Sequence, residues 1–116
     1  MIKKVISYEN ILRRVDDEKA FYFYKDVNVY TGIKANSLEE LATVLSTLPA
    51  DVIDFHLKRG DFERWIKDVF GDETLSKNIL KIREGGFAGD DAKKQLVRVI
   101  SRRLKDLQRR ITKVSS

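Results

Sequence analysis

The sequence predicts an α+β fold, in which a two-stranded antiparallel hairpin packs with four short helices and a long basic helix follows at the C-terminal end. An aromatic and β-branched stretch over residues 19–35 predicts the hairpin. Segments with apolar side chains three and four residues apart surround it and predict helices. Single glycines and one proline separate those segments, which indicates short helices with sharp ends. A chain of 116 residues fits one domain with a buried core.

The first elements are a short helix and the hairpin. Apolar spacing predicts a helix over residues 8–15, with Ser7 as its N-cap. In the stretch KAFYFYKDVNVYTGIKA, Asp26 and Asn28 indicate the turn between the two strands. Side chains alternate along a strand, so the phenylalanines share one face and the tyrosines the other: Phe21 and Phe23 against Tyr22, Tyr24 and Tyr30. The tyrosine face suits either base stacking or packing under a helix.

Each helix after the hairpin has its own start and stop signals. Their expected ranges are 37–48, 50–60, 61–71 and 72–84. Ser37 and Glu40, three residues apart, predict a capping box, and Asp61 and Asp72 are expected to cap later helices. The expected core positions are Leu38, Leu41, Leu45, Leu48, Val52, Ile53, Leu57, Phe62, Trp65, Ile66 and Val69.

The one break in composition is EGGFAGDD, at residues 84–91. Its three glycines indicate a flexible joint. The chain is therefore expected to consist of a compact α+β part over 1–84, a glycine-rich hinge over 85–91 and a basic amphipathic helix over 92–114, in a single domain overall.

Composition excludes several classes of protein. The chain has no cysteine, which rules out disulfides and thiolate chemistry and is compatible with a reducing cytoplasm. No segment resembles a secretory signal or a membrane span, so we expect a cytoplasmic protein with no membrane partner. Charged residues make up 35% of the chain, a proportion common among thermophile proteins.

The charge is unevenly distributed. Residues 93–113 contain nine Lys or Arg and one Asp, whereas the rest of the chain has 14 Lys or Arg and 17 Asp or Glu. Such asymmetry is typical of a protein with a polyanionic or acidic partner. Seven cations are candidate phosphate contacts: Arg98, Arg102, Arg103, Lys105, Arg109, Arg110 and Lys113.

The same segment has an apolar seam with heptad spacing. The candidate interface residues are Val97, Ile100, Leu104, Leu107 and Ile111. No acidic residue at the flanking positions faces Arg103 or Arg110 in a parallel pair. The seam therefore suits an antiparallel homodimer or docking on the protein's own body, and both alternatives stay open. Without an aromatic anchor it does not suit a membrane surface.

One cluster could support enzyme chemistry, namely His56 with Asp54, Asp61 and Glu63. A histidine oriented by a carboxylate can act as a general base. Structural roles account for these residues more simply, because Asp61 suits a helix cap, Glu63 suits a first turn and His56 suits a half-buried position. The prediction is therefore no catalytic residue, no metal and no cofactor.

The stretch FHLKRGDFERWIKDVFGDETLSKNI, residues 55–79, resembles a small archaeal domain family of unknown function, together with the aromatic strand pair and the helix start SLEEL. The resemblance covers about residues 18–83 and leaves the basic helix outside. It implies an archaeal, cytosolic source and assigns no activity.

The leading hypothesis is a non-enzymatic module whose basic helix binds RNA or DNA phosphates, with the ribosome and chromatin as settings for such contacts. The alternative is a protein-interaction or homodimerisation module that uses the apolar seam of the same helix.

Overall fold

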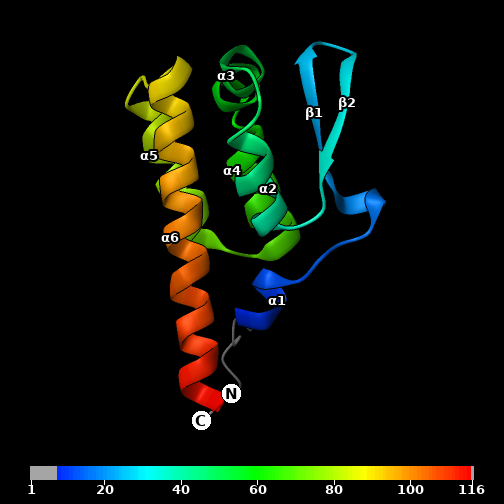
Figure 1. Cartoon of the computed structure of the whole chain (residues 1–116). Coiled ribbons are helices and arrows are strands. Elements are labelled where there is room, and N and C mark those ends of the chain that lie inside the picture. Colours follow the sequence, from blue (N-terminus) through cyan, green and yellow to red (C-terminus); the bar gives the residue numbers. More distant parts are fainter. Residues whose placement is uncertain (1–7, 116) are drawn as a thin grey trace.

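The computed structural model describes the backbone of residues 8–115 and the side chains of residues 8–112. In chain order the elements are α1 (Tyr8–Leu12), a 3-10 turn (Asp17–Lys19), β1 (Phe21–Asp26), β2 (Val29–Ala35), α2 (Leu38–Leu45), α3 (Ala50–Arg59), α4 (Asp61–Trp65), a π turn (Ile66–Phe70), α5 (Glu73–Glu84) and α6 (Gly89–Ser115). The hairpin and α6 lie on opposite sides of the molecule, with α2, α3 and α4 between them (Figure 1). The α+β fold is confirmed. The described chain has five short α-helices before α6, and the first of them, α1, ends at Leu12 instead of the predicted residue 15.

The hairpin pairs β1 with β2 in antiparallel register, from Phe21 opposite Ala35 to Asp26 opposite Val29. Asn28 occupies the turn with a φ of 60°, a conformation that asparagine tolerates better than most residues. The phenylalanine face is buried, since Phe23 is fully inaccessible to solvent.

Helix α2 begins as the sequence predicts and ends earlier. The Ser37 hydroxyl accepts the Glu40 N–H at 3.1 Å, while the Glu40 carboxylate accepts the N–H of Asn36 rather than that of Ser37. The helix ends at Leu45 instead of residue 48. Two hydroxyl side chains, Ser46 and Thr47, donate to carbonyl oxygens of the last turn, which competes with continued helical bonding.

The other helix boundaries depend on two glycines and one aspartate. Gly60 and Gly71 adopt left-handed conformations, with φ of 74° and 68°, and stop α3 and the π turn. Asp72 caps α5 as predicted, because its carboxylate accepts the Leu75 N–H at 3.1 Å. Asp61 does not cap α4, and that prediction is wrong. Its carboxylate instead binds the side chains of His56, Arg59 and Arg64.

Helix α6 belongs to the core. It packs against α1, α2, α3 and α5, and its buried residues are Ala92, Leu96, Ile100, Leu104 and Leu107. It begins at Gly89, before the predicted start at residue 92, because the Asp54 carboxylate accepts the Gly89 N–H at 2.9 and 3.0 Å. The flexibility expected of residues 85–91 stays a prediction.

Candidate functional site

The exposed side of α6 carries a row of cations. Arg98, Arg102, Lys105 and Arg109 are all exposed and recur every three or four residues, so they lie along one side of the helix. Arg98, Arg102 and Lys105 form no ion pair with any described residue, and Arg109 has only a long contact of 3.8 Å to Asp106. We name these four residues the basic row.

Lys94 extends the basic row toward the start of α6. It is exposed and precedes Arg98 by one helical turn. Lys94 is not among the predicted phosphate contacts, although its spacing of four residues from Arg98 was a usable signal. The side chain of the predicted contact Lys113 lies outside the described residues.

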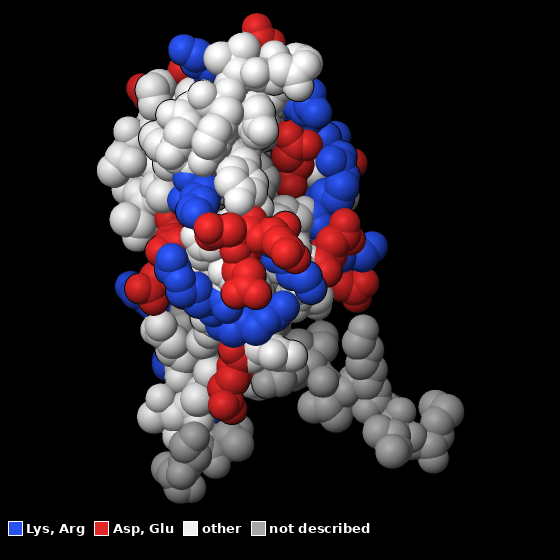
Figure 2. Space-filling model, turned by 90° about the vertical axis from the view of Figure 1, so that its right-hand side faces the viewer, with Lys and Arg blue, Asp and Glu red and all other residues white. Residues whose placement is uncertain are grey.

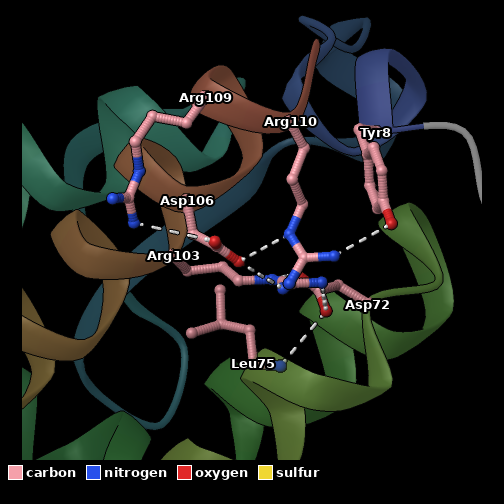
Figure 3. A network of polar contacts seen from close by, with 7 residues as sticks. All are labelled: Tyr8, Asp72, Leu75, Arg103, Asp106, Arg109 and Arg110. Atoms are coloured by element: carbon pink, nitrogen blue, oxygen red, sulfur yellow. Dashed lines mark hydrogen bonds and ion pairs between the residues drawn. The ribbon is translucent and has the colours of Figure 1, made fainter. Parts of the chain in front are cut away.

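Two predicted phosphate contacts have partners within the protein. The Arg103 guanidinium donates two hydrogen bonds, of 2.9 and 3.0 Å, to the Asp72 carboxylate, and the Arg103 side chain is only 14% exposed. Arg110 contacts Asp106 at 3.1 Å and donates to the Tyr8 hydroxyl at 3.2 Å. Figure 3 shows three arginines of α6 converging on Asp106. The single acidic residue among the nine cations is therefore already neutralised.

The apolar seam of α6 faces the protein's own core. Ile100, Leu104 and Leu107 are buried, whereas Val97 and Ile111 are half-buried. The helices that cover the seam are α1, α2, α3 and α5. A second copy of the chain can reach the middle of the seam only by displacing one of these helices.

His56 has both ring nitrogens in hydrogen bonds within the protein. Its Nε2 accepts the backbone N–H of Tyr24 at 2.8 Å, so the ring proton lies on Nδ1, which donates to Asp61 at 2.8 Å. The side chain is 4% exposed and lies within 5.1 Å, between ring centroids, of both Phe21 and Phe55. The interaction joins β1 to α3 and α4 and leaves neither nitrogen free to accept a proton from a substrate.

The state of His56 predicts a pH-dependent stability. Burial lowers the pKa of His56 below its usual 6.5, against the opposing effect of Asp61. As the pH falls, His56 is therefore protonated in the unfolded chain before it is protonated in the folded chain. The contribution of His56 to the free energy of unfolding is complete above about pH 6.5 and is lost as the pH falls toward the pKa of His56 in the folded chain. We expect urea denaturation to show a loss of at most about 1.4 kcal/mol one unit below pH 6.5.

His56→Gln is the matched control, because glutamine can accept from Tyr24 and donate to Asp61 without titrating. The chain has one histidine, so this variant should lose the pH-dependent step. An unchanged step in the variant would assign the titration to another group.

A hollow lies between the hairpin and the α3–α4 corner. It has a volume of about 470 Å³, and its lining includes Tyr24, Phe55, His56, Arg59 and Trp65. Its histidine is satisfied, and Arg59 is held over the Phe55 ring and against Asp61. This lining combines aromatic side chains with charges of both signs and does not single out one class of ligand.

The hairpin has several exposed apolar side chains. Tyr30 is 43% exposed and packs against Tyr22 and Tyr24, and Val27, Val29 and Ile33 are also exposed. Figure 2 looks onto this side and shows an uncharged region above a belt where acidic and basic side chains lie together. The basic row belongs to α6, on the opposite side of the molecule (Figure 1).

The part of the chain that the structure describes contains neither a candidate metal site nor a candidate membrane span. Within residues 8–115, no group of three His, Asp or Glu side chains is arranged to hold a metal ion. None of the helices described there has the combination of length and apolar composition that a membrane span requires.

Comparison with known proteins identifies one family. Searches of curated proteins and of solved structures found no match to the chain. A family model, described as "Family of unknown function (DUF5752)", matches residues 1–101. The match is longer than the expected 18–83 and includes the first half of α6. The chain therefore belongs to the DUF5752 family.

Proposed function

We propose that this DUF5752 protein is a non-enzymatic module that binds the phosphate backbone of RNA or DNA through the basic row of α6. The observation that supports the proposal is the absence of any ion pair from Arg98, Arg102 and Lys105 to a described residue, while Arg103 and Arg110 are neutralised. Uncompensated cations at helical spacing repel one another and destabilise a helix slightly. Binding to a polyanion relieves that repulsion, and the release of counterions from the polyanion makes the binding more favourable.

The dimensions of the row suit this partner. From Arg98 to Arg109 the helix rises about 16 Å, which is enough to meet several consecutive phosphates. Three of the four cations are arginines, whose planar guanidinium groups bind phosphate oxygens in pairs. The contacts involve no base edges, so the proposed binding is independent of sequence.

The composition of the chain favours a particular host and cellular location for this binding. An archaeal, thermophilic host and a cytoplasmic location agree with the high charge content and the lack of cysteine. Ribosomes and chromatin supply phosphates there. Homodimerisation through the seam has less support, because Ile100, Leu104 and Leu107 are buried within one chain.

The test is a fluorescence-anisotropy titration of labelled single-stranded RNA and duplex DNA with the full chain across a range of salt concentrations. Replacing Arg98, Arg102, Lys105 and Arg109 together with glutamine should reduce the slope of log K against log salt by about three units. All four side chains are exposed, so the fold should survive.

The matched control removes the same charge from other elements. Lys19, Lys25, Lys58 and Lys67 are exposed and lie outside α6, and their replacement with glutamine should leave most of the slope in place. Equal losses in the two variants would mean that only net charge matters. If the full chain fails to bind either nucleic acid at low salt, the proposal is wrong, and an acidic protein becomes the partner to seek.

A further inference from the structure

A groove of about 470 Å³ runs between α5 and α6, beside the basic row. Its lining residues are Thr74, Asn78, Lys81, Val99, Arg102, Arg103 and Asp106. The three residues from α5 are spaced by four and three positions, so they share one face of that helix. None of the three is among the residues for which the sequence predicts a binding role.

The groove is positively charged after its internal pairs are taken into account. Arg103 is bound to Asp72, and Asp106 is bound by arginines of α6. Lys81 and Arg102, one on each helix, are exposed and form no ion pair with the described part of the chain. Two uncompensated cations from different helices therefore border the same hollow.

Neutral polar side chains complete the α5 side. Within the described residues, neither the Thr74 hydroxyl nor the Asn78 amide has a hydrogen-bond partner in the protein, so both can donate to a ligand. Hydroxyl and amide side chains are common partners of phosphate and sugar oxygens in nucleic-acid complexes. Val99 adds the apolar residue of the lining.

The groove is held in shape by the residues behind it. The Asp72 carboxylate caps α5 through Leu75 and binds Arg103 of α6 at the same time. Asp72 is 1% exposed, and its contacts therefore fix the start of α5 relative to α6 away from solvent. The two walls are thus positioned before a ligand binds, which reduces the cost of ordering them.

We propose that this groove is where the nucleic-acid backbone is seated, with one phosphate between Lys81 and Arg102 and with Thr74 and Asn78 bonding its oxygens or the adjoining sugar. The proposal rests on the proposed function and extends it, because it adds α5 to a surface that otherwise consists of a single helix. It predicts a two-helix footprint.

The test compares two lysines of the same helix. Lys81 lines the groove, whereas Lys77 is also exposed on α5 and does not line it. In the full chain, Lys81→Gln should reduce the salt slope by about 0.7 for single-stranded RNA or about 0.9 for duplex DNA, and Lys77→Gln should leave it nearly unchanged. Thr74→Ala with Asn78→Ala should weaken binding several-fold at every salt concentration without altering the slope, because these side chains are neutral.

The outcomes separate this inference from the proposed function. If the full chain binds, the basic-row variant loses the binding, and Lys81→Gln behaves like Lys77→Gln, the groove is not the seat and only this inference fails. If the full chain does not bind, both fail. A difference between the two lysines, with thermal unfolding unchanged in each variant, supports the groove.

Discussion

Asp72→Ala is expected to lower the free energy of unfolding by about 3–5 kcal/mol. The substitution removes the N-cap of α5, whose loss alone costs about 1 kcal/mol. It also leaves Arg103, which is 14% exposed, without the carboxylate that binds two of its nitrogens. The remaining acidic contact of Arg103, to Asp106 at 3.5 Å, is too long to replace that pair. Urea denaturation monitored by circular dichroism measures the change.

Two further variants separate the roles of Asp72. Asp72→Asn keeps a capping oxygen and loses the charge, so the difference between the asparagine and alanine variants reports the cap. Asp106→Ala removes a half-exposed carboxylate of the same network and should cost less than about 1 kcal/mol. A cost for Asp72→Ala no larger than that for Asp106→Ala would show that the buried pair does not stabilise the α5–α6 contact.

The parts of the fold that depend on neighbouring residues could be predicted from the sequence. The Ser37 and Asp72 caps and the Gly60 and Gly71 stops act within a few residues of their own positions, and all four were predicted correctly. Asp61 had the same local signal as Asp72. It was predicted wrongly because α4 begins at Asp61 itself, after Gly60 as N-cap, and because the side chains of His56, Arg59 and Arg64 bind its carboxylate. All three lie within five positions of Asp61, but spacing alone does not show that they compete with the backbone N–H groups.

The candidate site shows the same division. Helical spacing was enough to group the cations of α6 and would also have identified Lys94. It could not identify every paired cation, because Arg103 meets Asp72 from 31 positions away. The pair of Arg110 with Asp106, four positions apart, has helical spacing and could have been identified from the sequence. The groove between α5 and α6 could not be predicted from residue spacing for a related reason, since its lining comes from two helices separated by a loop.

The position of α6 leads to the largest predicted effect, which is that a chain cut after residue 88 should not fold cooperatively. The sequence predicted a hinged helix attached to a compact part at 1–84. In the structure the apolar face of α6 is buried against α1, α2, α3 and α5. Without α6 those helices would expose their own apolar faces, and the lost burial cannot be replaced in a domain of this size. Circular dichroism during heating should show no sharp transition, and the truncated chain should bind a hydrophobic dye.

Single substitutions in the full chain measure how much individual side chains of α6 contribute to the free energy of unfolding. Leu96 and Ile100 are completely buried, so Leu96→Ala and Ile100→Ala should each cost about 2–5 kcal/mol. Arg98 lies between them on the exposed side, and Arg98→Ala should change stability by less than about 0.5 kcal/mol. A cooperative melt from the truncated chain would instead support the hinged arrangement. If α6 is part of the core, its basic row is held at a fixed orientation by the same side chains that stabilise the fold.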